Sequence, residues 1–190
     1  MSLQTKLLTY EDYLLMPQIH QPSEIIQGEL RMTPAPSPDH QWVAMNIYTL
    51  LRQFVAKRGL GVVLAAPCDV IISRSPLQTR QPDVLFLNAE RTGITGRSEL
   101  RKKKPTEIIP DLVVEVLSPK DSRQEIDEKL RDYQKIGVRE AWLVSPEAET
   151  IEVLRISSGE ITTAGLYGLN DKLSSNVLGG FDLQVTEVFK

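Results

Sequence analysis

The chain has 190 residues with a formal net charge of −3 at pH 7, and 41% of its residues are hydrophobic. This size suits one compact domain over residues 1–190, and the acidic balance argues against tight, constitutive binding of duplex DNA through many phosphate contacts. No apolar run approaches the ~20 residues that a membrane-spanning helix needs.

The first residues and the cysteine usage bear on the cellular compartment. Met1–Gln4 do not begin a basic segment followed by an apolar core, so we expect no export signal. The one cysteine, Cys68, excludes an internal disulfide and fits a reducing environment. We therefore expect a cytoplasmic protein in which Cys68 is a small core residue.

The first third of the chain predicts a helix, a hairpin and a second, longer helix. A short helix is expected to begin near Thr9, which can cap it. The stretch Glu24–Leu30 predicts a hairpin that turns at Gln27–Gly28. Ser37 precedes a proline and predicts the cap of a long amphipathic helix that runs to about Arg58.

The middle of the chain predicts strands separated by polar segments. Strands are expected over Val62–Ala66, Asp69–Ile72 and Asp83–Leu87, with a turn-like stretch over Ser73–Thr79. The polar segment Asn88–Pro110 predicts a loop or a partly helical excursion.

The second half begins with a Val-rich run, Leu112–Leu117, that is typical of a strand covered on both faces. Ser122, with a glutamate three residues later, predicts a capped helix from Arg123 to about Ile136. A strand over Ala141–Val144 follows, at the distance of a crossover between parallel strands, and antiparallel strands are expected from Thr150 onward. The order predicts an α/β or α+β fold with a mixed central sheet flanked by helices and extra β-hairpins at both ends.

Three charged residues are expected where charge is costly. Glu115 interrupts the apolar run, and an ionised carboxylate there needs a cation, a metal or hydrogen-bond donors. On a helical wheel, Lys129 falls inside the apolar arc of Ile126 and Leu130. Asp83 opens a neighbouring strand. Lys129 at the edge of the arc could instead extend to solvent, or form a purely structural ion pair with Glu115.

Two carboxylates and a lysine at one end of a sheet have a known chemical use. Mg²⁺ prefers hard oxygen ligands and keeps several positions for water or phosphate oxygens. A nearby ammonium can orient the attacking water and stabilise negative charge in a phosphoryl transition state.

At this point the residues resemble the PD-(D/E)XK nuclease superfamily and, more closely, the Uma-two family, whose members are described as putative restriction endonucleases. The matching segments are Ser23–Leu30, Ser37–Gln41, Pro82–Val84, Pro110–Pro119, and Lys129–Tyr133 continuing through Gly137–Trp142. The resemblance implies a restriction-endonuclease-like core and a Mg²⁺- or Mn²⁺-dependent endonuclease that hydrolyses phosphodiester bonds of DNA, expected as a homodimer.

The resemblance also implies roles for individual residues. Asp83 would be the motif aspartate and Glu115 the acid of the (D/E)XK element, and both would be metal ligands. The lysine position of that element is Leu117, so Lys129 would carry the role from the following helix. The remaining implied site residues are Glu24 as a further acid near the metal, His40 near the site, and Tyr133 in support of Lys129.

Other interpretations remain open. His40 could be a structural donor, Glu24 an exposed strand acid, and both tryptophans, Trp42 and Trp142, are interpreted as core residues. The acidic composition and the missing in-motif lysine favour, as the alternative, a nuclease-fold protein that binds nucleic acid or a protein partner without cutting. A third interpretation is a hydrolase of other substrates in which the two acids form an acid/base pair.

Overall fold

The structure, a computed structural model, describes residues 7–17, 19 and 21–190. The residues on which the export expectation rests, Met1–Gln4, lie outside the described part. Among the described helices, none is long and apolar enough to span a bilayer.

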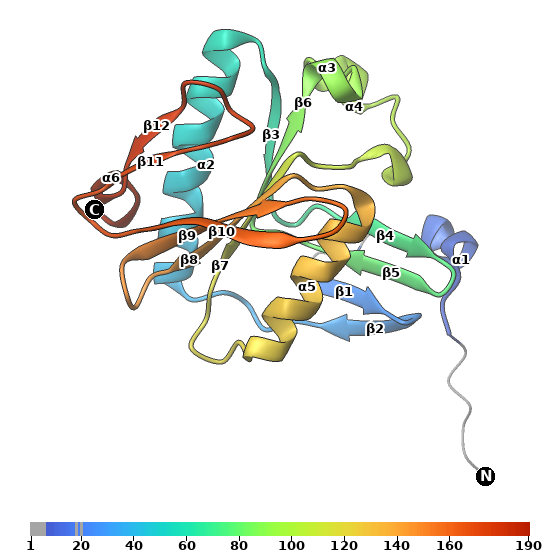
Figure 1. The fold of residues 1–190 in the computed structure, drawn as a ribbon. Helices are drawn as coiled ribbons and strands as arrows, with labels where there is room; N and C mark the ends of the chain where they lie inside the picture. Colours follow the sequence, from blue (N-terminus) through green and yellow to red (C-terminus); the bar gives the residue numbers. More distant parts are fainter. Residues whose placement is uncertain (1–6, 18, 20) are drawn as a thin grey trace.

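The described residues form a six-stranded mixed sheet in the order β10-β9-β8-β7-β6-β3 (Figure 1). Its strands are β3 (Gly61–Ala65), β6 (Val84–Asn88), β7 (Leu112–Val116), β8 (Glu140–Ser145), β9 (Thr150–Ile156) and β10 (Ile161–Tyr167). Strands β7 and β8 pair in parallel, and the other neighbours are antiparallel. The predicted mixed sheet and its parallel crossover are therefore confirmed.

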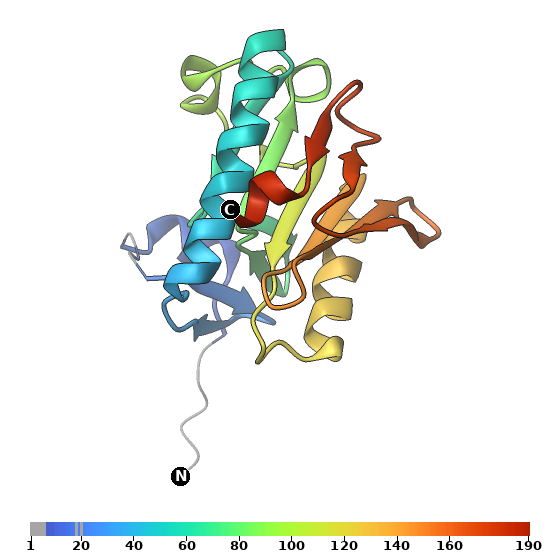
Figure 2. The same ribbon diagram turned by 90° about the vertical axis from the view of Figure 1, so that its left-hand side faces the viewer.

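Two helices cover the two faces of this sheet (Figures 1 and 2). Helix α2 (Pro38–Arg58) lies on one face, and α5 (Arg123–Ile136), the crossover between β7 and β8, lies on the other. Because side chains alternate along a strand, Val114 of β7 joins the core under α2 and Val113 joins the core under α5. Glu115 follows the same alternation and faces α5.

The helix boundaries follow the capping signals in the sequence. The side chain of Ser37 accepts a hydrogen bond from the backbone of α2, and Ser122 and Glu125 form a reciprocal capping box at the start of α5. Gly137 ends α5 with a left-handed backbone. The short first helix, α1 (Tyr10–Leu15), is capped by Thr9 as predicted.

The remaining strands pair as hairpins outside the central sheet. They are β1 (Ser23–Ile26) with β2 (Glu29–Met32), β4 (Val70–Arg74) with β5 (Leu77–Arg80), and β11 (Lys172–Ser174) with β12 (Asp182–Gln184). The first hairpin turns at Gln27–Gly28, where both residues have positive φ, as predicted. The hairpins near both ends of the chain confirm the predicted fold class.

Several sequence-based expectations need correction. The stretch Ser73–Thr79 is not one turn, because β5 already begins at Leu77 and all four of its residues are buried. Trp142 is a core residue, whereas Trp42 is 61% exposed on α2, so its core interpretation was wrong. The polar segment after β6 is partly helical, as predicted: it contains the short helices α3 (Ala89–Thr92) and α4 (Arg97–Leu100) and the 3-10 turn η1 (Pro105–Glu107). A last helix, α6 (Thr186–Phe189), was not predicted.

Candidate active site

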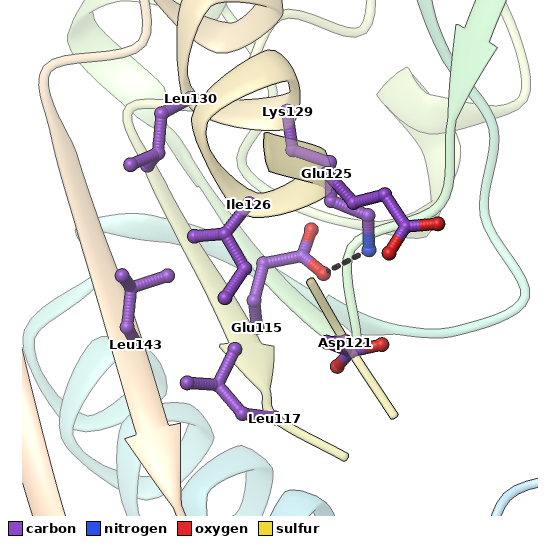
Figure 3. A pocket seen from close by; sticks show the side chains of 8 residues that line it. All are labelled: Glu115, Leu117, Asp121, Glu125, Ile126, Lys129, Leu130 and Leu143. Carbon is purple, nitrogen blue, oxygen red and sulfur yellow. Dashed lines mark hydrogen bonds and ion pairs between the residues drawn. The ribbon is translucent and has the colours of Figure 1, made fainter. Parts of the chain in front are cut away.

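Glu115 is the acid of the buried strand β7, and its side chain meets two donors from α5. The residue is 5% exposed. The Lys129 ammonium donates a hydrogen bond to Oε2 of Glu115 at 2.6 Å, and the Tyr133 hydroxyl donates to Oε1. Figure 3 shows the Lys129 side chain descending from α5 to the carboxylate. Lys129 and Tyr133 are four residues apart and therefore share one face of the helix.

Burial and neighbouring charges shift the ionisation of this group of residues. Burial raises the pKa of Glu115, Lys129 partly offsets this, and Asp83 adds to it, so the net shift is upward. Burial alone would lower the pKa of Lys129, but the carboxylates of Glu115, Glu24 and Asp83 raise it above its usual value. Lys129 is therefore an ammonium ion throughout the physiological range.

Asp83 lies immediately before β6, next to the carboxyl end of β7. Its Oδ2 accepts a hydrogen bond from the backbone N–H of Val116 at 2.8 Å, which ties it to the residue after Glu115. The antiparallel register pairs Val84 with Val114, so Asp83 and Glu115 occupy the adjacent opposing positions. Its effect on the pKa of Glu115 and of Lys129 shows that the charges of the three residues interact.

His40 approaches Asp83 from the first turn of α2. The Nε2 atom of His40 lies 3.4 Å from Oδ2 of Asp83. The hydrogen bond to Asp83 raises the pKa of His40, although burial opposes the shift. Its other ring nitrogen, Nδ1, is buried and has no hydrogen-bond partner among the residues that the structure describes.

Glu24 lies on β1 and is held by neighbours from β5 and the segment after it. Its Oε2 accepts a hydrogen bond from Arg80 at 2.9 Å, and its Oε1 accepts one from the backbone N–H of Gln81 at 3.2 Å. Glu24 still raises the pKa of Lys129 through its charge. The structure thus brings Glu24 to the edge of the site, with both carboxylate oxygens already engaged.

A small cleft opens beside Glu115, between α5 and strands β7 and β8 (Figure 3). Its lining is apolar on one side and charged on the other: Leu117, Ile126, Leu130 and Leu143 face Glu115, Lys129, Asp121 and Glu125. Leu117, which the resemblance described above places at the lysine position of the motif, belongs to the apolar side. The ammonium of this site therefore comes from α5.

The donor set can be compared with the needs of a divalent metal. Among the described residues, no three side chains of histidine, cysteine, aspartate or glutamate gather closely enough to form a protein cage for a metal ion. Mg²⁺ does not require such a cage, because it commonly uses one or two carboxylates together with waters and substrate phosphates. Asp83 and Glu115 fit that requirement, since both are carboxylates and each oxygen of Glu115 has a second lone pair beyond its present hydrogen bond.

Arg80 and Asp132 belong to the site's surroundings and were missed by sequence reasoning. Arg80 contacts Glu24 at 2.9 Å and Asp132 at 2.7 Å. Asp132 directly precedes Tyr133, a position that could have drawn attention to it. Arg80 lies directly after the stretch Ser73–Thr79 that was predicted to be turn-like, and only its position three residues before Asp83 could have indicated it.

Comparison with known proteins identifies the family. The family described as "Putative restriction endonuclease", Uma2, matches residues 10–186. The chain belongs to this family. The resemblance inferred from the motifs is thereby confirmed for nearly the whole chain. No curated protein matches the Uma2 chain described here.

A solved structure shares the fold of this Uma2 protein. It is a crystal structure described as a putative nuclease belonging to DUF820, from Anabaena variabilis ATCC 29413. The two chains are 19% identical and superpose with a TM-score of 0.74, over 96% of this chain and 97% of the other. At that identity the likeness establishes a common fold and carries no assignment of individual residues.

Proposed function

We propose that this Uma2 protein is a metal-dependent endonuclease that hydrolyses phosphodiester bonds of DNA. The observation that carries the proposal is the buried Glu115 carboxylate bonded to the Lys129 ammonium at 2.6 Å, with Asp83 tied to the same strand end. A structural ion pair alone would not require a second acid whose charge raises the pKa of the first. Perturbed carboxyl groups clustered with a lysine are typical of catalytic sites.

In this proposal Asp83 and Glu115 are the metal ligands and the metal is Mg²⁺ or Mn²⁺. When bound, such an ion supplies a Lewis acid for the scissile phosphate and lowers the pKa of a bound water. Family membership supports a divalent metal and does not distinguish between the two ions.

Lys129 takes the role of the catalytic lysine. Its ammonium, fixed by Glu115, stabilises negative charge that develops on the phosphate oxygens. Tyr133 holds the other oxygen of Glu115 and so fixes the orientation of the carboxylate. His40 keeps Asp83 in place through its Nε2 atom. Glu24 contributes a further negative charge near Lys129.

The test is cleavage of supercoiled plasmid DNA by the purified full chain with Mg²⁺, Mn²⁺ or EDTA. We expect nicking or linearisation that EDTA abolishes and that Asp83→Asn, Glu115→Gln and Lys129→Met each reduce by about 100-fold or more. Glu147→Gln makes the same acid-to-amide change on the exposed surface and is expected to retain activity. Cleavage that survives all three site substitutions would place the chemistry elsewhere.

The alternative function is nucleic-acid or partner binding without turnover. The observation behind this alternative is that Lys129 and Tyr133 already engage both oxygens of Glu115, as they would in a purely structural ion pair. A gel shift with a fragment of the plasmid, together with no cleavage in either Mg²⁺ or Mn²⁺, would support this alternative. Activity that persists in EDTA would instead support a metal-independent hydrolase that uses the two acids as an acid/base pair.

We also propose that the protein acts as a cytoplasmic homodimer. The proposal follows from the need to cut two antiparallel DNA strands, which a two-fold symmetric pair of sites can meet. Sedimentation equilibrium at micromolar concentration should give twice the chain mass of 21.4 kDa. A monomer mass with and without a cognate duplex would contradict this assembly.

A further inference from the structure

Arg80 is a buried cation that bridges parts of the chain far apart in the sequence. It is the last residue of β5 and is only 7% exposed. Its Nη1 atom lies 2.9 Å from Oε2 of Glu24 on β1. Its Nη2 and Nε atoms lie 2.7 and 2.8 Å from Oδ2 of Asp132 on α5. One guanidinium thus joins the N-terminal hairpin to the helix that carries Lys129 and Tyr133.

The bridge is reinforced on both sides. Gln78, two residues before Arg80 on the same strand, donates a hydrogen bond to Oδ2 of Asp132 at 2.5 Å. The backbone of Gln81 holds the second oxygen of Glu24. Within the described part of the chain, the hydrogen-bond donors to these two acids come from β5 and from Gln81 directly after it. An arginine suits this bridging role because its planar fork offers several fixed N–H groups.

The acid that Arg80 holds is a natural competitor for Lys129. Lys129 and Asp132 are three residues apart on α5, and side chains at this spacing are neighbours on a helix surface. A free Asp132 carboxylate could therefore draw the Lys129 ammonium along the helix and away from β7. With Oδ2 of Asp132 bound by Arg80 and Gln78, Lys129 instead reaches Glu115 at 2.6 Å.

We propose that Arg80 is a positioning residue: by binding Asp132 it directs the Lys129 ammonium to Glu115, and by binding Glu24 it docks the first hairpin beside the site. The proposal rests on the proposed function, since it assigns Arg80 a part in the same active site. Arg80 itself contacts neither Asp83 nor Glu115 among the hydrogen bonds and ion pairs of the described residues. Its removal should therefore disturb the lysine more than the metal ligands.

The experiment compares Arg80→Met with the double variant Arg80→Met/Asp132→Asn. In the single variant we expect kcat for plasmid cleavage to fall by about 10- to 100-fold, the size of effect that a displacement near 1 Å produces. The Mg²⁺ concentration for half-maximal activity should stay within about threefold, a factor worth less than 1 kcal/mol. In the double variant, removal of the Asp132 charge should restore part of the lost kcat, while Glu24 remains without its arginine.

A crystal structure of each variant gives a readout that does not depend on activity. In Arg80→Met the distance from Nζ of Lys129 to Oε2 of Glu115 should exceed the ~3.2 Å limit of a hydrogen bond, with the ammonium near Asp132. In the double variant the contact with Glu115 should return. If Arg80→Met does not fold, two other variants carry the same comparison. The double variant leaves only Glu24 without its arginine, and Arg80→Lys keeps the charge but loses the fork. Arg80→Lys should then retain only part of kcat.

Arg91→Met is the matched control. Arg91 lies on α3 and pairs with the fully buried Asp111 at 2.8 Å. Asp111 directly precedes the amino end of β7, whereas Glu115 lies near the carboxyl end of the strand. Its loss should lower the melting temperature without lowering kcat. The inference is overturned if Arg80→Met keeps wild-type kcat, if it lowers kcat only as far as Arg91→Met does, or if Lys129 stays on Glu115 in its crystal structure.

The failure of this inference can be told apart from failure of the proposed function. If the wild-type chain shows no metal-dependent cleavage, the proposed function is lost, while the crystal structures still decide whether Arg80 positions Lys129. If the wild-type chain cleaves DNA and Arg80→Met does so equally well, the function stands and the role of Arg80 is refuted.

Discussion

Replacing Lys129 by methionine tests the electrostatics of the site without reference to any substrate. Methionine keeps much of the apolar stem and removes the ammonium, which leaves the Glu115 carboxylate with the Tyr133 hydroxyl as its remaining donor. Breaking a buried ion pair by removing one partner costs about 3–5 kcal/mol. The Lys129 side chain is 30% exposed, so solvent screens part of this interaction. We expect a loss of about 2–3 kcal/mol at pH 8.

The direction of the pKa shift fixes how this loss depends on pH. The pKa of Glu115 is already raised by burial, and losing Lys129 removes the main opposing influence, so it rises further. A carboxyl group whose folded-state pKa lies above its unfolded value contributes stability below the unfolded pKa and loses it as pH rises through the folded pKa. The destabilisation by Lys129→Met should therefore be small near pH 5 and grow toward pH 8.

Thermal unfolding followed by circular dichroism, in EDTA at pH 5 and pH 8, measures both effects. For a chain of this length about 2–3 kcal/mol corresponds to a decrease in Tm of roughly 4–12 °C. Lys135→Met, an exposed lysine on the same helix, should shift Tm by no more than about 2 °C, as surface substitutions do. Equal losses at the two pH values, or a loss no larger than that of Lys135→Met, would refute a charged and buried Lys129–Glu115 pair.

Three further predictions concern other parts of the molecule. Burial and a neighbouring acid raise the pKa of Cys68 to about 11. The native thiol should therefore react with Ellman's reagent at pH 8 on the order of 100-fold more slowly than a free cysteine, and its rate should increase as pH rises. A rate like that of glutathione would contradict this prediction. Trp142→Phe should lower the free energy of unfolding in urea by about 2–4 kcal/mol, because it leaves a void and leaves the buried Glu140 oxygen without its donor. The same change at the exposed Trp42 should lower it by about 1 kcal/mol or less, and equal losses would argue against the assigned core. Gly61→Ala should lower the free energy of unfolding in urea by more than about 3 kcal/mol, because the new Cβ would lie 1.9 Å from a carbonyl oxygen of β6. Gly159→Ala has open space around it and should leave this free energy nearly unchanged. A soluble Gly61→Ala variant of wild-type stability would contradict the strand pairing.

Local signals explain why much of the fold could be predicted from the sequence. Helix α5 has a reciprocal capping box at Ser122 and Glu125 and a terminating glycine at Gly137, so its ends are determined within the helix itself. The apolar run of β7 is similarly unambiguous, and the length between β7 and β8 requires a crossover. For the same reason Lys129 could be placed on the buried side of α5 by its spacing alone.

The β5 strand shows why other features were missed. Three of its four residues, Gln78, Thr79 and Arg80, are polar and yet buried, so neither alternation nor an apolar run indicates a strand. Their burial is possible because partners from β1 and α5 meet their hydrogen-bonding groups. Such partners come from distant segments of the chain, and a local pattern contains no trace of them.

Because Lys129 lies on the crossover helix, the site forms only when this part of the chain has folded completely. Glu115 is the next-to-last residue of β7, and Lys129 belongs to the helix that leads to the next strand. A lysine two residues after the acid would instead stand beside it as soon as the strand formed. Here the lysine reaches the acid only after the helix has settled onto the sheet, with the correct rotation about its own axis. A nascent or partly opened chain would thus hold all the reactive groups and still be harmless to nucleic acid.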